Sequence, residues 1–188
     1  MPYFGDEDAR SIIRATYEAA SPVGVHVAET LYTAEELAGV ADDAVRWAFG
    51  VGNPVRHAGL RPGDIVLDVG CGAGIDALIA AKRVAPDGRV IGIDMTPAML
   101  ERARHHAAAM KLDNAEWHEG LMEALPLSDH VADVVLCNGV VNLSTRKSRA
   151  LAEMRRVLRP GGRLAMADLV LTESLPEEIQ RDATALAA

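Results

Sequence analysis

An apolar run that leads directly into glycines at every second position most constrains how this chain can fold. Val66–Val69 is followed by Gly70, Gly72 and Gly74, and then by the amphipathic segment Ile75–Val84. Glycine allows the left-handed backbone of a tight turn. A helix that begins directly after such a turn offers free N–H groups and the positive end of its dipole to a ligand. The pattern therefore predicts a strand, a binding turn and a helix in succession. The alternative is a plain turn that needs glycine only for its backbone.

Beyond this turn, short apolar or β-branched runs alternate with longer amphipathic segments. That alternation is typical of βαβ units and predicts an α/β fold with a doubly wound, mainly parallel sheet. We expect strands at Ile65–Val69, Arg89–Asp94, Ala115–His118, Val131–Asn138 and Arg163–Leu171, and helices between them at Ile75–Val84, Pro97–Met110 and Arg146–Leu158. Thr96 and Thr145 are the expected N-caps of the last two helices, and Pro160-Gly161-Gly162 is the expected stop signal after the third.

The first 60 residues have a different sequence pattern, which is helical and irregular. Thr33 and Glu36 form a capping box, and the apolar residues after them keep helical spacing up to Gly50. We therefore expect one helix there whose apolar face covers another part of the protein. The length of 188 residues is that of a single domain. We divide it into a helical N-terminal cap (1–60), a cofactor-binding core (61–171) and a C-terminal helical segment (172–188), in which Leu175–Leu186 is helix-like.

Composition limits the classes of function. Apolar residues make up 49% of the chain, but no apolar run approaches the ~20 residues that cross a bilayer. The N-terminus is acidic where a secretion signal would be basic, so we expect a cytoplasmic protein without a membrane partner. The net charge of −8, with no basic stripe, disfavours nucleic acid. The two cysteines, Cys71 and Cys137, lack the spacing of zinc ligands or of a disulfide framework, and we expect no metal.

Two carboxylates beside the glycine turn indicate what it binds. Asp94 ends the second expected strand, 20 residues after Gly74, and an acidic side chain at about that spacing accepts hydrogen bonds from the hydroxyls of an adenosine ribose. Asp68 suits a cationic amino-acid group and would repel a pyrophosphate. Ile75 stands where dinucleotide sites have glycine or alanine. These details favour S-adenosylmethionine over NAD. The alternatives are that Asp68 bonds its own turn and that Asp94 is an exposed turn residue.

Several motifs carry a family resemblance, and they lie in Val66–Gly74, Gly92–Pro97 and Arg156–Arg163. The chain resembles class I S-adenosylmethionine-dependent methyltransferases of the arsenite and ubiquinone/menaquinone type. More narrowly, it looks like arsenite methyltransferases in Gly50–Pro54, Ile93–Thr96 and Cys137–Ser144. The resemblance covers about residues 45 to 180. It implies S-adenosylmethionine as the cofactor and a small molecule as the methyl acceptor.

The resemblance also assigns roles to residues at the turn and at neighbouring strand ends. It implies that the glycine turn and Asp68 hold the methionine part, that Asp94 binds the ribose and that Met95 covers a face of the adenine. Gly120–Glu123 would flank the adenine, and Asn138 would lie near the methionine carboxylate. Many relatives have an acidic residue at the Leu121 position, where this chain offers only backbone groups and packing. The implied cofactor-binding residues are Asp68, Gly70, Cys71, Gly72, Gly74, Asp94, Met95, Leu121, Met122 and Asn138.

The cysteines that hold arsenic in arsenite methyltransferases are missing here. Trivalent arsenic needs thiolate ligands because it is soft. The resemblance places two of those cysteines at Val51 and Gly139 of this chain, and a further one beyond residue 188. Cys71 and Cys137 do not replace them, because one lies in the cofactor turn and the other on the preceding strand. We therefore expect a methyltransferase that does not act on arsenite.

The sequence names no catalytic residue. Methyl transfer needs alignment of the reacting atoms and at most one base. His26 and His57 precede the sheet and are expected to be satisfied or at the surface, while the consecutive His105 and His106 are expected to be solvated. Two rival functions stay open. One is a non-methylating S-adenosylmethionine-binding scaffold or cyclase-type protein, and the other is a nicotinamide dehydrogenase, which the glycine spacing disfavours.

The fifth expected strand has no neighbour on its outer side in this sequence. A complete domain of the resembled class has strands in the order 3-2-1-4-5-7-6, but after Leu171 this sequence leaves no run for strands six and seven. The fifth strand would be an edge with little charge and no proline, which invites pairing with another chain. We expect that it pairs with a second copy in a homodimer, or that the chain is a shortened form of a longer protein.

Overall fold

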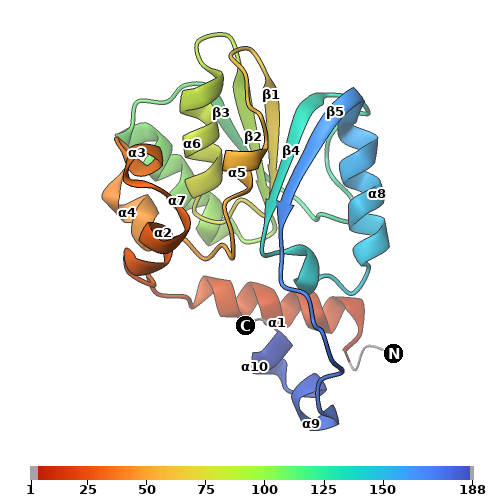
Figure 1. Ribbon diagram of the computed structural model, residues 1–188. Helices are drawn as coiled ribbons and strands as arrows, with labels where there is room; N and C mark the ends of the chain where they lie inside the picture. The colour runs from red at the N-terminus through yellow and green to blue at the C-terminus, as the bar shows by residue number, and fades with distance from the viewer. Residues whose placement is uncertain (1–3, 187–188) are drawn as a thin grey trace.

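The computed structural model describes residues 4–186, and its centre is one parallel sheet. The sheet has five strands in the order β3-β2-β1-β4-β5. Helices cover both faces (Figure 1), which confirms the predicted doubly wound α/β fold. Within residues 4–186 no strand follows β5, in line with the expected lack of strands six and seven. The strands are β1 (Ile65–Val69), β2 (Arg89–Asp94), β3 (Ala115–Glu119), β4 (Ala132–Asn138) and β5 (Leu158–Ala167).

Ten α-helices and one short 3-10 helix are assigned within residues 4–186. Among these described helices, none has the length and apolar character needed to cross a bilayer. The helices are α1 (Asp6–Glu18), α2 (His26–Leu31), α3 (Ala34–Leu37), α4 (Asp42–Arg46), α5 (Pro54–His57), α6 (Ile75–Val84), α7 (Pro97–Ala109), η1 (Val141–Leu143), α8 (Lys147–Val157), α9 (Glu177–Gln180) and α10 (Ala183–Leu186).

The core lies on the two faces of the sheet. Val66 and Leu67 of β1 belong to different clusters because successive side chains of a strand point to opposite faces. The larger cluster joins the sheet to α6, α7 and the N-terminal helices, and the smaller one joins it to α8. The neighbouring strands β1 and β4 are buried on both faces, which explains why they appear in the sequence as continuous apolar runs.

Local signals predicted the elements around the turn closely. The observed bounds of β1, β2 and α6 are the predicted ones, and α7 and α8 differ from prediction by one residue at their ends. Thr96 is the N-cap position of α7, as expected. The predicted N-cap of α8 was wrong: Arg146 occupies that position. Thr145 lies one residue earlier, and its hydroxyl donates to Asp6 of α1 instead.

The helix predicted from the capping box to Gly50 was wrong in its length. The capping box is present, with the Glu36 N–H donating to Thr33 Oγ1 at 3.2 Å. The helix that it starts, α3, ends at Leu37, and α4 begins at Asp42. Gly39 between them has a φ of +72°. That left-handed backbone stops a right-handed helix, so helical spacing continued in the sequence while the chain turned.

The predicted position of the fifth strand was also wrong. It begins at Leu158, so that Pro160-Gly161-Gly162 lies inside β5, where the register with β4 shifts between Ala132 and Val134. It ends at Ala167 rather than at Leu171. Asp168 turns the chain away from the sheet, because its carboxylate accepts from the N–H groups of Asn142 and Leu169 at 3.1 and 2.8 Å.

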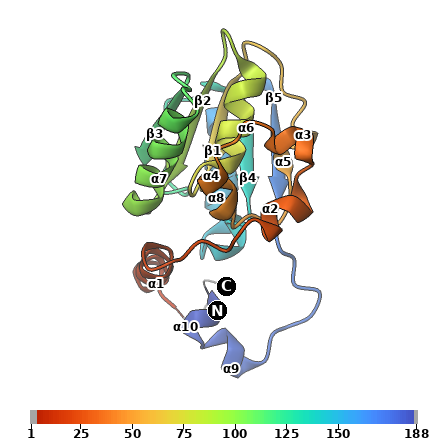
Figure 2. The ribbon, with the colours of Figure 1, turned by 90° about the vertical axis from the view of Figure 1, so that its left-hand side faces the viewer.

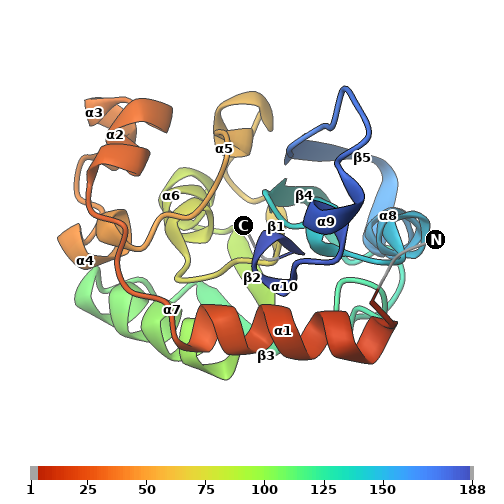
Figure 3. The ribbon, with the colours of Figure 1, turned by 90° about the horizontal axis from the view of Figure 1, so that it is seen from below.

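The two ends of the described chain meet below the sheet. Helix α1 lies across the carboxyl ends of the strands (Figures 1 and 3). The chain after β5 loops away and returns as α9 and α10, and α10 contacts α1 (Figure 2). The predicted helix-like segment is therefore two short helices. Residues 1–3 and 187–188, at the ends of the predicted cap and C-terminal segment, lie outside the described residues, and the division of the chain into those segments stays a prediction.

Candidate functional site

The glycine turn lies at the carboxyl edge of the sheet, where β1 ends beside β2. The N–H groups of Gly70 and Cys71 donate to the carbonyl of Ile93 at 2.7 and 3.0 Å, which fixes the turn to the neighbouring strand. Gly70, Gly72 and Gly74 have φ values of +70°, +52° and +95°. This backbone conformation requires glycine at all three positions, because residues with a side chain rarely adopt a positive φ.

Two of these glycines also allow close packing. A Cβ at Gly70 would lie 2.6 Å from a methyl of Val140, and a Cβ at Gly74 would lie 2.9 Å from the Trp117 ring. A Cβ at Gly72 would meet nothing within 4 Å. The turn is therefore packed tightly on two sides and open at Gly72, so that a ligand can approach the backbone there.

Asp94 closes the turn from the end of β2. Its Oδ2 accepts from the Gly72 N–H and its Oδ1 accepts from the Thr96 N–H, both at 2.9 Å. Burial raises the pKa of Asp94 from its ordinary value, while these two bonds lower it. A carboxylate can accept about four hydrogen bonds, so Asp94 keeps acceptor capacity toward the pocket.

Asp68 is a buried carboxylate without a full set of partners. Its side chain lies on β1, and the residue is 2% exposed. Within residues 4–186 its Oδ2 accepts no hydrogen bond. Burial, and next the nearby carboxylate of Asp76, raise the pKa of Asp68 well above its ordinary value. A buried anion of this kind is costly until a cation or a donor meets it.

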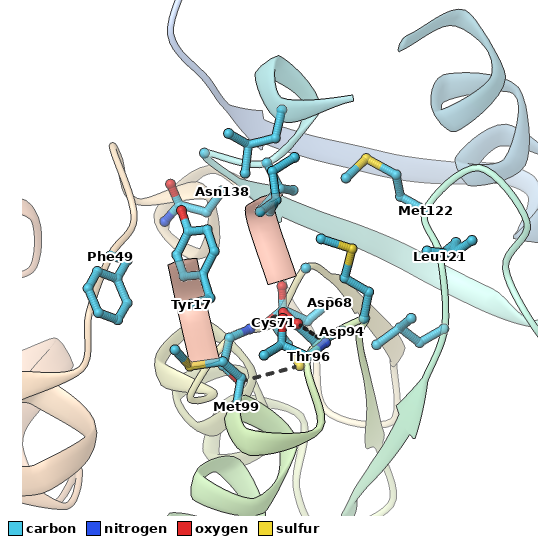
Figure 4. Close-up of a pocket in the computed structure, with 18 of the residues that line it drawn as sticks. Tyr17, Phe49, Asp68, Cys71, Asp94, Thr96, Met99, Leu121, Met122 and Asn138 are labelled. Atoms are coloured by element: carbon cyan, nitrogen blue, oxygen red, sulfur yellow. Dashed lines mark hydrogen bonds between the residues drawn. The ribbon is translucent and has the colours of Figure 1, made fainter. Parts of the chain in front are cut away.

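One pocket gathers all ten residues that the resemblance implied as cofactor-binding, and it is shown in Figure 4. Tyr17, Phe49 and Asn138 lie on one side of it, and Leu121 and Met122 on the other. The predicted residues in its lining are Asp68, Gly70, Cys71, Gly72, Gly74, Asp94, Met95, Leu121, Met122 and Asn138. Their contact with a cofactor stays a prediction.

The lining of the pocket is acidic. Among the described residues of the lining, one side chain is basic, that of Arg10, which pairs with Glu123 at 3.6 Å. The acidic side chains in the lining are Asp6, Asp68, Asp76, Asp94 and Glu123. Such a pocket attracts a cationic ligand and repels a pyrophosphate. This charge balance disfavours a dinucleotide, and with it the rival function of a nicotinamide dehydrogenase.

Sequence reasoning missed the aromatic wall of the pocket. Tyr17 of α1 and Phe49 meet edge to face with ring centroids 5.8 Å apart, and Trp47 meets Phe49 at 5.9 Å. The guanidinium of Arg102 lies 3.9 Å from the centroid of the Trp47 ring. The run Trp47-Ala48-Phe49 could have indicated a wall, but nothing in the sequence places Tyr17 beside it.

Helix α1 closes the pocket from below the strand ends. Ala9 and Ile13 are buried, and both line the pocket. Ion pairs fix the helix to the end of β3 and to the segments that follow β3 and β4. Arg14 pairs with Glu119, the last residue of β3, at 3.3 Å, and Arg10 and Asp6 pair with residues after β3 and after β4. Because its partners lie more than 100 residues away, no local pattern predicted this contact.

The expectation that His106 is solvated was wrong. His106 is 1% exposed, and its ring nitrogens lie 2.9 Å from the Ala73 carbonyl and 3.0 Å from Asp43 Oδ2. It therefore ties the glycine turn to α7 and α4, whereas its neighbour His105 is exposed. The buried face of α7 includes Met99, Ala103 and His106, and the contact of α4 with α7 supplies the Asp43 partner of His106.

Asn138 is held by the protein itself. Its Oδ1 accepts from the N–H groups of Val51 and Gly52 at 3.0 and 3.1 Å. Its Nδ2 donates to the Gly52 carbonyl and to Asp76 Oδ2, both at 2.9 Å. The side-chain amide is thus engaged on both sides, and any contribution of Asn138 to a ligand would come from its backbone or its packing.

An open glycine turn, an acidic residue at the end of β2 and an acidic pocket are the features expected of an α/β protein that binds a positively charged nucleoside. A model of the methyltransferase domain family matches residues 60–188. The arsenite methyltransferase of Halobacterium salinarum is 45% identical over 155 residues, which are 82% of this chain and 39% of that protein. The demethylmenaquinone methyltransferase of Symbiobacterium thermophilum is 41% identical over 110 residues, covering 58% of this chain and 44% of that protein.

Among solved structures, an arsenic(III) S-adenosylmethionine methyltransferase from Chlamydomonas reinhardtii matches with a TM-score of 0.69 and 39% identity, covering 85% of this chain and 53% of that one. The chain belongs to the methyltransferase domain family. S-adenosylmethionine is the cofactor that this membership implies. The chain spans less than two thirds of the length of each of these relatives.

Proposed function

We propose that the chain binds S-adenosylmethionine in this pocket and transfers its methyl group to a small-molecule acceptor. The observation that carries the proposal is the unpartnered Oδ2 of buried Asp68 at the edge of the glycine turn. The α-ammonium group of the cofactor is a cation of the kind that this oxygen needs. When bound, the cofactor supplies an electrophilic methyl group on a positively charged sulfur.

Each part of the cofactor has candidate residues in the pocket. Asp68 and the open backbone at Gly72 would hold the methionine part, and Asp94 would accept from the ribose hydroxyls. Met95 and Met122 are apolar side chains that would pack against the adenine. The aromatic rings of the pocket wall and α1 would exclude water from the reacting atoms, so that the chain acts by binding and alignment. The acceptor would gain the methyl group at its nucleophilic atom and release a proton to solvent, with S-adenosylhomocysteine as the other product.

Product analysis tests methyl transfer. With S-adenosylmethionine and a broad panel of small acceptors, S-adenosylhomocysteine should accumulate together with a methylated product. Mass spectrometry of both products, with boiled protein as the control, separates enzymatic transfer from slow cofactor breakdown. Tight cofactor binding without S-adenosylhomocysteine from any acceptor would instead favour the non-methylating scaffold or cyclase-type protein.

We propose further that arsenite is not the acceptor. Val51 and Gly139 occupy the two positions where the resembled family has arsenic-binding cysteines. A Cβ at Gly139 would lie 3.3 Å from a methyl of Val51, so the two positions are neighbours just beyond the carboxyl end of β4. Neither residue offers a thiolate, and the described cysteines Cys71 and Cys137 are both buried. Burial raises the pKa of both thiols above the ordinary value, which keeps them protonated and poor ligands.

Arsenite should therefore give no methylated arsenic with the natural chain, measured by chromatography with arsenic detection. The double variant Val51→Cys/Gly139→Cys, kept reduced, should bind arsenite more tightly than either single variant, because two adjacent thiolates chelate the ion. The single variants are the matched controls. Methylated arsenic from the natural chain would contradict the proposal.

The edge strand supports a proposal about assembly. Leu164 and Met166 of β5 are 42% and 44% exposed, and the C-terminal segment runs to α1 instead of along this edge (Figure 2). An apolar edge of this kind is protected when it pairs with another strand. We propose that two copies of this chain pair through β5 in a homodimer.

Light scattering at micromolar concentration should show a dimer, and Leu164→Lys/Met166→Lys should shift it to monomer because charge on an edge opposes pairing. The control is Val23→Lys, at an apolar residue that is 43% exposed and whose N–H donates to the Arg46 carbonyl of α4. Helix α4 contacts α7, which packs on β3 at the other edge of the sheet, so this variant should leave the dimer intact. A stable natural monomer would contradict the proposal.

We also propose a cytoplasmic location without a nucleic-acid partner. Two unpaired thiols are the ordinary state of cysteine in a reducing compartment, and a net charge of −8 with an acidic pocket repels phosphate chains.

A further inference from the structure

The segment Phe49–Gly52 lies against the carboxyl ends of β4 and β5 at a distance that only glycine permits. A Cβ at Gly50 would lie 2.3 Å from Asn138 Nδ2, and a Cβ at Gly52 would lie 2.5 Å from the Cβ of Ala167. Both contacts are shorter than any side chain tolerates. The segment is therefore pressed onto the two strand ends, and its backbone polar groups face the side chain of Asn138.

Asn138 holds this segment with both ends of its amide. Its Oδ1 accepts from two N–H groups of the segment, those of Val51 and Gly52, and its Nδ2 donates to the Gly52 carbonyl. If the amide rotated by half a turn, an NH2 group would face two N–H groups, and all three bonds would be lost. The hold on the segment thus depends on which way the amide points.

Asp76 decides that orientation. The carboxylate of Asp76, in the first turn of α6, accepts from Asn138 Nδ2 at 2.9 Å with its Oδ2 and from the hydroxyl of Tyr32 at 2.8 Å with its Oδ1. Asp76 is 5% exposed and Tyr32 is 4% exposed, so water does not compete for these bonds. An ionised carboxylate can only accept, and it therefore keeps the NH2 group of Asn138 turned toward itself.

We propose that Asp76 is a positioning residue that acts through Asn138 to hold Phe49–Gly52 in place, and so sets the position of the Phe49 ring in the pocket wall. Phe49 lines the pocket and meets Tyr17 edge to face. The statement that this wall borders the methyl acceptor rests on the proposed function. The contacts that run from Asp76 through Asn138 to Phe49–Gly52, which we call the clamp, do not depend on it. An apolar aromatic ring held in this way favours acceptors with an apolar or planar body.

Fluorine NMR can test the clamp without any acceptor. The chain has two phenylalanines, Phe4 and Phe49, so incorporation of 4-fluorophenylalanine gives two signals, which Phe4→Leu assigns. In the cofactor-free protein, Asp76→Leu should move or broaden the Phe49 signal, because the Asn138 amide loses the acceptor that orients it. Asp76→Asn should rescue the natural signal, because the new amide can still present an oxygen to Asn138 and its NH2 group to Tyr32.

Two further variants make the result decisive. Tyr32→Phe removes the other bond to Asp76 and the longer bond of 3.4 Å from Asn138 Nδ2 to the Tyr32 hydroxyl. It leaves the Asp76 oxygen that orients Asn138, so it should leave the Phe49 signal in place. Asn138→Ala should move the signal as Asp76→Leu does, and the double variant should add nothing, because the two residues act in series. Amide exchange at Val51 and Gly52 should rise roughly tenfold in both disrupted variants, as expected from lost hydrogen bonds.

An unchanged Phe49 signal in Asn138→Ala overturns the proposal, even if Asp76→Leu fails to fold. A signal that moves in Asp76→Asn as far as in Asp76→Leu also overturns it, because charge or bulk would then matter instead of an acceptor. A separate titration of the natural protein with S-adenosylhomocysteine reports on the proposed function. If that titration shows no binding while the clamp is intact, the proposed cofactor binding is contradicted and the positioning role of Asp76 still stands.

Discussion

Replacing Asp68 by asparagine is expected to weaken S-adenosylmethionine binding by about 2 to 4 kcal/mol, or roughly 30- to 1000-fold. The reason is that the buried Oδ2, which has no partner within residues 4–186, would lose the charge that holds an ammonium group. Asparagine has the same shape, so the pocket should otherwise be unchanged. Isothermal calorimetry with S-adenosylmethionine and S-adenosylhomocysteine measures the effect, which should be similar for both ligands because both carry the ammonium group.

The same variant should make the cofactor-free protein more stable, by about 1 to 2 kcal/mol at neutral pH. Burial raises the pKa of Asp68 above its unfolded value. A raised carboxyl pKa contributes stability that is complete below the unfolded pKa and is lost as the pH rises through the folded one. The neutral asparagine avoids that loss, so its advantage should vanish below the unfolded pKa of about 4. Urea unfolding at several pH values would show this trend.

The matched control is Asp133→Asn. Asp133 accepts from the Ile65 N–H at 2.8 Å and pairs with Arg159 at 2.8 Å, at the opposite end of the sheet from the glycine turn. Its asparagine variant should lose stability and keep natural cofactor affinity. Natural affinity in Asp68→Asn would show that the ammonium group is held elsewhere and would remove the main support for the proposed site.

The second large effect is expected at Asp94. Asp94→Ala should weaken both S-adenosylmethionine and S-adenosylhomocysteine by about 1.5 to 3 kcal/mol, or roughly 10- to 150-fold, through loss of charged hydrogen bonds. Part of the loss comes from the ribose hydroxyls. The rest comes from the turn, because the N–H groups of Gly72 and Thr96 lose the acceptors that they reach at 2.9 Å. Calorimetry measures the affinity, and Asp94→Asn, which keeps one acceptor oxygen, should show a smaller loss.

Adenosine distinguishes the two carboxylates. It has the ribose but no methionine part, so Asp94→Ala should weaken adenosine binding, and Asp68→Asn should leave it unchanged. Equal affinity of the natural protein and Asp94→Ala for all three ligands would show that the cofactor placement is wrong. Equal losses of adenosine affinity in the two variants would mean that both act by loosening the turn.

Whether a feature could be predicted depended on how far apart in the sequence its interacting residues lie. The bounds of β1, β2 and α6 agreed with prediction because strand alternation, helical spacing and glycine at left-handed positions act within a few residues. The position of Asp94 at the end of β2 follows from the same local pattern. The failures near Gly39 and Asp168 came from residues that redirect the chain while the apolar spacing continues.

The sequence by itself therefore determined the parallel sheet, the glycine turn and the two carboxylates beside it, because each depends on local backbone preference and on the order of the strands. Only the tertiary structure decided that α1 closes the pocket, that His106 is buried against Asp43, and that Asp68 lacks a partner. It also decided that Asp76 and Asn138 meet, across a sequence separation of 62 residues. Such contacts depend on how whole elements pack, and the free energy of packing is shared among residues that no local pattern connects.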